Sequence, residues 1–379
     1  MLILNSLLIL YGVLSVKGHE SGQIPLLAKV PVISNRPVLQ EGGYVPSFAG
    51  ISTFAHLPYL DCWDKDLPEE DYDIAIMGVP YDIGVTFRTG ARFGPSAIRE
   101  GSKRIKVHER KATGGYNLEV GVNPFKSWAK SVDCGDVPFE PFDSQHALSQ
   151  IEAYTGYILS RPGLHVPRLI TLGGDHTILL PVLRAMSVAH GRPLSVIHFD
   201  SHLDTWAPEI YNVKAKGSQY NHGNPLYHAS KEGLIAHGSS LHVGIRSSLY
   251  EEQDIGRDEA LGFHIIKAND IFDLGLEGIA RRMKEVLGPK RDALVYLSVD
   301  IDVIDPSMAP ATGTPETGGF LTREMRYLLR SLDGYNIVGM DLVEVAPAYD
   351  TQAQLTSFLA ADLIYETLSM MVKYGETVN

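Results

Sequence analysis

Six short apolar runs, separated by segments of helical periodicity, constrain the fold of this chain more than any other feature. The runs cover residues 73–79, 169–172, 195–199, 241–245, 294–299 and 337–343. The helical patterns cover 145–159, 178–190, 274–286, 322–332 and 356–374. Strands that alternate with helices form a mostly parallel sheet with helices on both faces. The sequence therefore predicts one α/β domain, a three-layer sandwich over residues 71–379.

Residues 1–70 differ from the rest of the chain. An apolar run from Leu2 to Val16 ends at Val16-Lys17-Gly18, and its length is too short for a comfortable membrane span. We interpret residues 1–18 as a cleaved secretory signal, with a buried N-terminal helix as the alternative. Prolines that include Pro25, Pro31, Pro37, Pro46 and Pro58 interrupt residues 19–70, which we expect to be an extension that wraps the domain or contacts a neighbouring subunit. We expect no membrane span in the mature chain.

The charge balance and the two cysteines narrow the class of protein. There are 33 basic and 45 acidic residues, a net charge of -12, whereas phosphate binding needs basic patches. We therefore expect no nucleic-acid partner. A cationic substrate is compatible with this charge, although most surplus carboxylates form a solvated surface. Cys62 and Cys134 could form one disulfide in a secretory compartment or remain free thiols.

Histidines and aspartates follow three of the predicted strands, where parallel sheets collect ligands. Residues at alternating positions in extended backbone point the same way. Crowded carboxylates cost several kcal/mol unless cations neutralise them. Six ligands exceed the needs of one tetrahedral zinc, and carboxylates with some imidazole favour manganese. The sequence therefore predicts two Mn²⁺ held by His176, Asp200, His202, Asp204, Asp300 and Asp302.

Three sequence blocks resemble the ureohydrolase family of arginase, agmatinase and guanidinobutyrase. They are GGDH at 173–176, DSHLD at 200–204 and SVDIDVIDP at 298–306, within a resemblance that covers about 73–367. It implies an arginase-like three-layer fold with a parallel sheet. It also implies that a metal-activated water attacks the guanidinium carbon of a small cationic substrate, and that an amine and urea leave. By analogy we expect a homo-oligomer, a trimer or hexamer.

The resemblance also distributes the ligands and adds two catalytic residues. His176 and Asp204 would hold one manganese, His202 and Asp302 the other, and Asp200 and Asp300 would bridge them. Glu344 would bind the guanidinium through two parallel hydrogen bonds. His222 would shuttle the proton to the departing amine.

Further histidines receive no catalytic role from the sequence. His198 lies two residues before Asp200, so in extended backbone both side chains would point the same way. We interpret His198 as a core or supporting residue rather than a ligand. We expect the remaining candidates to be structural or exposed: His190, His228, His237 and His242.

The blocks TGARFGP at 89–95 and TGTPETGG at 312–319 resemble the agmatinase branch. Thr205-Trp-Ala-Pro-Glu lacks the asparagine and serine with which arginases bind the amino acid head group. The predicted reaction is therefore agmatine to putrescine and urea. A guanidino acid such as 4-guanidinobutyrate stays open, because Lys214 or Lys216 could meet a carboxylate, although solvated loop lysines are the simpler reading. A non-catalytic binding protein and a single-zinc amide hydrolase are weaker alternatives.

Overall fold

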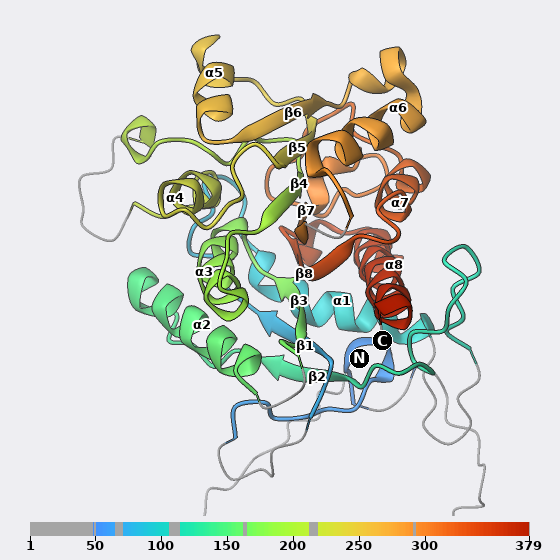
Figure 1. Ribbon diagram of the computed structural model, residues 1–379. Coiled ribbons are helices and arrows are strands. Elements are labelled where there is room, and N and C mark those ends of the chain that lie inside the picture. The colour runs from blue at the N-terminus through green and yellow to red at the C-terminus, as the bar shows by residue number, and fades with distance from the viewer. Residues whose placement is uncertain are drawn as a thin grey trace, which may run out of the picture. The chain divides into compact units, whose positions relative to one another are not determined.

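Eight parallel strands form one sheet in the part of the chain that the structure describes (Figure 1). The computed structural model describes residue 48 and residues 51–64, 71–105, 114–161, 165–211, 219–290 and 293–378. The predicted signal at 1–18 and much of the 19–70 extension lie outside these residues. Chain contacts divide the protein into residues 1–43 and residues 44–379, and every described residue belongs to the second unit.

The strand order is β2-β1-β3-β8-β7-β4-β5-β6, and all seven neighbouring pairs are parallel. Six of these strands match the predicted runs. The other two, β2 and β6, are the edge strands, whose polar residues interrupt the apolar pattern that buried parallel strands show. The strand bounds are β1 (Ile74–Val79), β2 (Ser131–Asp136), β3 (Arg168–Gly173), β4 (Ser195–Phe199), β5 (Ser240–Ile245), β6 (Phe263–Lys267), β7 (Leu294–Asp300) and β8 (Asn336–Val343).

Helices cover both faces of the sheet, as predicted (Figure 1). On one face lie α2 (Ser144–Leu159), α3 (Leu179–His190), α4 (Pro225–Lys231) and α5 (Gln253–Ala260). On the other lie α1 (Gly94–Ser102), α6 (Asp270–Leu287), α7 (Thr322–Arg330) and α8 (Leu355–Val378). The helical patterns predicted α2, α3, α6, α7 and α8. The described helices that were not predicted, α1, α4 and α5, span nine, seven and eight residues, although α7, which was predicted, is also only nine residues long.

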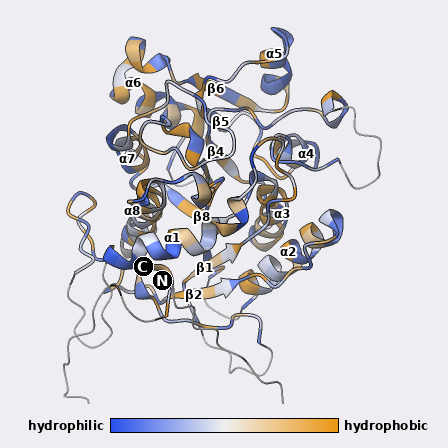
Figure 2. Ribbon diagram, turned by 180° about the vertical axis from the view of Figure 1, so that it is seen from behind, coloured by the Kyte–Doolittle hydropathy of each residue, from blue (hydrophilic) through white to orange (hydrophobic). Residues whose placement is uncertain are grey.

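Strand alternation divides the buried side chains into two cores. In β1, Ile74 and Ile76 join the core under α1 and α6 to α8, whereas Ala75 and Met77 join the core under α2 to α4. In Figure 2, orange marks hydrophobic residues, and orange stretches lie along the strands. Within α8, the stretch Leu355–Gly375 is long and apolar enough to cross a membrane, but 72% of it is buried in the protein, as in the core helix of a globular domain.

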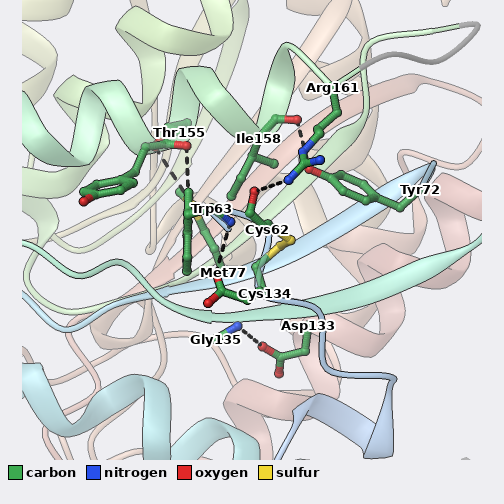
Figure 3. The surroundings of a disulfide bond; sticks show 12 residues. Cys62, Trp63, Tyr72, Met77, Asp133, Cys134, Gly135, Thr155, Ile158 and Arg161 are labelled. Carbon is green, nitrogen blue, oxygen red and sulfur yellow. Dashed lines mark hydrogen bonds between the residues drawn. A yellow bond between two sulfur atoms is a disulfide. The ribbon is translucent and has the colours of Figure 1, made fainter. Parts of the chain in front are cut away.

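Cys62 and Cys134 form a disulfide, which decides between the two alternatives that the sequence left open (Figure 3). Both residues are fully buried. Beside the bond, Tyr59 forms a parallel bridge with Asp133 of β2. The described part of the extension, residues 51–64, therefore packs along the β2 edge of the sheet.

Candidate metal centre

The six predicted ligands lie at the carboxyl ends of β3, β4 and β7, which are close neighbours in the sheet. Tight packing at the end of β3 positions the first of them. A Cβ atom on Gly174 would lie 1.8 Å from the carbonyl oxygen of Tyr81, so only glycine fits there. The chain then turns at once into a 3-10 turn (His176–Ile178), whose first residue is a predicted ligand.

The ligand side chains converge through turns and not through extended backbone, which corrects the sequence argument from alternation. Asp302 lies in a 3-10 turn (Ile301–Val303), and its backbone N–H donates to the Asp300 side chain over 2.8 Å. Asp204 has a positive φ of 55°. The backbone N–H of His202 donates to Asp200 Oδ1 over 2.6 Å. Short side-chain-capped turns are typical of aspartates that follow a strand, and they bring alternate residues together here.

The donor atoms form two groups that share one aspartate. His176 Nδ1 lies 2.9 Å from Asp204 Oδ2 and 3.2 Å from Asp200 Oδ2. His202 Nδ1 lies 3.1 Å from Asp302 Oδ2 and 3.2 Å from Asp200 Oδ1. Asp200 thus presents one oxygen to each group, as a bridging carboxylate would.

Asp300, the other predicted bridge, contacts one side of the cluster. Its Oδ2 lies 3.6 Å from His176 Nδ1, while its Oδ1 accepts the Asp302 N–H. The cluster therefore brings together all six predicted ligands, with Asp200 in the more central position.

The electrostatics of the cluster fit divalent cations. Burial, followed by the charges of Asp302 and Asp200, raises the pKa of Asp300 well above its usual range. Burial and the Asp200 charge also raise the pKa values of Asp204 and Asp302. Within the described residues, His176 Nδ1 and Asp200 Oδ2 are buried and have no hydrogen-bond partner. Imidazole nitrogens and carboxylate oxygens that lie close together without hydrogen-bond donors are suited to bind a divalent cation.

A buried chain sets the tautomer of His176. Tyr296 donates to Asp341 Oδ2 over 2.7 Å, and Ser298 donates to Asp341 Oδ1 over 2.8 Å. The Ser298 hydroxyl oxygen then accepts from His176 Nε2 over 2.7 Å. The other ring nitrogen, Nδ1, consequently carries a lone pair toward the carboxylates, as metal ligation requires.

Glu344 and His222, the two predicted catalytic residues, form a pair beside the cluster. Glu344 follows β8 with a positive φ of 62°. Its Oε1 accepts from the His176 backbone N–H over 2.9 Å and faces His222 Nδ1 at 3.0 Å. Its Oε2 is buried without a partner among the described residues. The strained backbone thus holds one carboxylate oxygen ready for a donor.

The Glu344 carboxylate also controls the charge of His222. Burial lowers the pKa of His222, but the charge and hydrogen bond of Glu344 outweigh burial and raise it to about 9. On the other side of the ring, the Thr86 backbone N–H donates to Nε2 over 3.1 Å, and Thr86 Oγ1 lies 2.6 Å from the same nitrogen. Glu344 therefore favours a protonated His222, whereas the Thr86 N–H favours a lone pair at Nε2.

A sequence profile described as Arginase family matches residues 72–369. The chain belongs to the arginase family. It is 48% identical over 342 residues to "Putative agmatinase 3" of Schizosaccharomyces pombe, which covers 87% of this chain and 81% of that protein. It is 36% identical over 330 residues to the guanidinobutyrase of Pseudomonas aeruginosa, covering 87% and 95% respectively. The solved proclavaminate amidino hydrolase of Streptomyces clavuligerus has a TM-score of 0.75 and 34% identity, and covers 87% of this chain and 100% of its own.

Membership of the arginase family confirms the resemblance and the predicted fold. The roles of individual residues stay predictions, although all eight meet at one rim. Lys214 and Lys216, considered above for a substrate carboxylate, lie outside the described residues.

The residues behind the cluster received no catalytic role from the sequence. His198 is fully buried, as expected of a core residue, and its Nε2 lies 2.9 Å from Asp200 Oδ2. Burial lowers the pKa of His198 to about 3, so the ring is neutral. His242, which was left unassigned, pairs in register with His198 across β4 and β5. Such a contact between two histidines can be predicted only once it is known that their strands are neighbours in the sheet.

Proposed function

We propose that this arginase-family chain hydrolyses a guanidino C–N bond and releases urea, with two Mn²⁺ as its metal ions. One observation carries the proposal: beside a dense set of metal-binding donors, Glu344 offers a buried carboxylate oxygen that has no partner in the described chain. A guanidinium is a planar cation with paired donors, which suits such an oxygen. His222, whose pKa is raised by Glu344, lies next to it and can serve the leaving group.

The residues that would hold the ions follow from the two donor groups. His176 and Asp204 would hold one ion, and His202 and Asp302 the other. Asp200, which faces both groups, would bridge, together with Asp300. When bound, two dications supply the positive charge that makes water nucleophilic at neutral pH and stabilises the developing negative charge.

The other steps belong to the chain's own side chains. Glu344 Oε2 accepts hydrogen bonds from the guanidinium and orients its carbon. The Oε1 atom is held by the His176 N–H, so the carboxylate keeps its orientation. As the oxygen of water bonds to the carbon and the C–N bond breaks, the two protons that this water loses end on the departing amine, and His222 gives one proton to the amine and takes one back. The products are an amine and urea.

Agmatine is the substrate that we propose first. The relative at 48% identity is named as an agmatinase, and residues after Asp204 lack the groups that the resemblance assigns to amino acid binding in arginases. A guanidino acid is the second candidate, because a relative at 36% identity is named guanidinobutyrase.

We further propose a secretory location and a homo-oligomer. The apolar run at 2–16 supports the first, and so does the disulfide between Cys62 and Cys134, since disulfides persist in oxidising compartments. The second follows the expectation from the family.

Urea release from a substrate panel tests the proposed function. The chain, loaded with manganese and then freed of excess metal, is assayed with agmatine, 4-guanidinobutyrate, 3-guanidinopropionate and arginine. We expect agmatine to give the highest kcat/KM, and chelator-treated protein to be inactive until manganese is restored. Arginine as the best substrate would overturn the branch assignment, and 4-guanidinobutyrate as the best would select the second candidate. No urea from any of them would refute the proposal.

A further inference from the structure

A second buried chain of polar side chains leads away from the metal-binding donors. His198 Nδ1 lies 2.7 Å from His242 Nδ1, and His242 Nε2 lies 3.2 Å from Asp258 Oδ1. Asp258, near the end of α5, also accepts from Thr205 Oγ1 over 2.6 Å. His198 and His242 are fully buried, and Asp258 is 1% exposed. Neither His242 nor Asp258 has a place in the proposed chemistry.

The direction of each hydrogen bond follows from the carboxylate at the far end. Asp258 Oδ1 already accepts from Thr205 Oγ1, and such a carboxylate oxygen accepts rather than donates, so His242 Nε2–H donates to it. A neutral His242 then has a lone pair at Nδ1, to which His198 Nδ1–H donates. The last nitrogen, His198 Nε2, is left with a lone pair, and it points at the rim where Asp200 lies.

The geometry at that last nitrogen agrees with a lone pair. His198 Nε2 lies 2.9 Å from Asp200 Oδ2, within reach of a hydrogen bond, but within the described residues neither atom has a partner whose geometry meets that of a hydrogen bond. His176 Nδ1 is in the same situation, 3.2 Å from the same oxygen. Three electron-rich atoms that converge without donors repel one another unless a cation lies near them.

The two histidines are thus oriented by chains of the same design. The chain through Ser298 ends at Asp341, and the chain through His242 ends at Asp258. In each case a buried carboxylate, acting through one intermediate group, turns an imidazole lone pair toward the donors. Outer partners of this kind orient ligands at metal sites.

We infer that Asp258 is a positioning residue of the metal centre: acting through His242, it fixes the tautomer of His198 so that a lone pair faces Asp200. An N–H at His198 Nε2 would instead donate to Asp200 Oδ2 and compete with a cation for that oxygen. Asp258 therefore strengthens metal binding without touching the metal. This inference rests on the proposed dinuclear centre, but not on the identity of the substrate.

Manganese affinity of the metal-free protein tests the inference, because it needs no substrate. In Asp258→Asn the amide can donate to His242 Nε2, which reverses both hydrogen bonds and places an N–H at His198 Nε2. We expect the affinity to fall about 10- to 100-fold, the range found for outer partners of metal ligands. The electron paramagnetic resonance spectrum of the bound Mn²⁺ should change as well, since Asp200 faces both donor groups.

Asp254→Asn is the matched control. Asp254 lies one turn earlier on α5, is 3% exposed and pairs with Arg257, and no contact joins it to His242. We expect its manganese affinity to match that of the unaltered chain. An equal loss in both variants would mean that α5 packing alone matters, and would overturn the inference. Unchanged affinity in Asp258→Asn would overturn it too.

His242→Phe provides the second variant. The ring keeps its stacking on Phe263, 4.3 Å between centroids, but loses the hydrogen bonds. If Asp258 acts only through His242, adding Asp258→Asn to His242→Phe should lower the affinity no further. If the double variant instead loses manganese affinity by the product of the two single losses, Asp258 does not act only through His242.

The substrate panel keeps the two proposals apart. Urea release by the unaltered chain, together with normal metal binding in Asp258→Asn, would leave the proposed function intact and remove this inference. Impaired metal binding in Asp258→Asn, with no guanidino substrate hydrolysed by the unaltered chain, would support this inference and refute the proposed function.

Discussion

Buried carboxylates occur in two kinds of region, and their partners differ. On β2, Asp133 is fully buried and accepts from Arg99 through both oxygens, each over 2.9 Å. At the carboxyl ends of β4 and β7, Asp200 and Asp300 are equally buried but have other carboxylates and histidines around them. On β2, the Arg99 guanidinium neutralises the Asp133 carboxylate within the protein. The second region leaves negative charge that a ligand must neutralise, which distinguishes a functional site from a structural ion pair.

Titration behaviour separates the two kinds of region as well. For Glu366 of α8, burial raises the pKa, but the hydrogen bonds from Arg330 and Arg326 outweigh burial and lower it. For Asp300, burial and the neighbouring carboxylates act in the same direction and raise it. Glu366 thus favours folding at neutral pH, whereas an ionised Asp300 opposes folding until cations arrive.

The largest effect should come from Asp200→Asn at the shared position of the metal centre. The amide removes one negative charge that faces both donor groups. We expect kcat for urea release to fall at least about 100-fold, beyond the loss typical of outer partners, and bound manganese to fall below two ions per chain. Metal analysis and steady-state kinetics would check this, and normal values in both would refute the ligand assignment.

Asp133→Asn should do the opposite, reducing stability and sparing chemistry. It leaves the Arg99 guanidinium buried without its bidentate partner, a change that costs about 3–5 kcal/mol in other proteins. We expect a lower free energy of unfolding in urea, with kcat per folded, manganese-loaded molecule unchanged. If activity fell while stability held, the contrast between the two regions would be wrong.

Cys62→Ser with Cys134→Ser should have a smaller effect at the same β2 edge. The bond joins positions 72 residues apart, and loss of such a cross-link costs about 2–4 kcal/mol through the unfolded chain. Denaturant unfolding should show this loss, and the substrate panel should show unchanged kcat/KM. A change in substrate preference would place the disulfide in the site, contrary to the structure.

The smallest effect is the pH dependence contributed by Asp300. A carboxyl whose pKa is higher in the folded than in the unfolded state destabilises the fold as pH rises above about 4, the unfolded value. Metal-free wild-type protein should therefore lose stability relative to Asp300→Asn as pH rises from about 4 toward 7. Saturating manganese should reverse that difference, because the ions compensate the charge. A pH-independent difference in unfolding free energy would contradict the proposed repulsion.

Local patterns predicted the central strands because those strands are buried on both faces. Continuous apolar runs such as 195–199 and 294–299 are visible without knowledge of their neighbours. The edge strand β2, with Asp133 and Asp136 in its sequence, shows no such run, because its acidic residues are compensated by Arg99 from α1. That compensation depends on packing and cannot be seen in the strand itself.

By itself, the sequence determined the kinds of donor and the sheet edge at which they gather, since parallel strands align their carboxyl ends wherever they lie in the order. It also carried the family assignment, through blocks that include His176, Asp200 and Asp300. Only the tertiary structure decided which oxygen faces which group, that Cys62 meets Cys134, and that Asp258 reaches His198 through His242. Those facts depend on strand order and on turns that reverse local direction, and residues far apart in the chain establish them together.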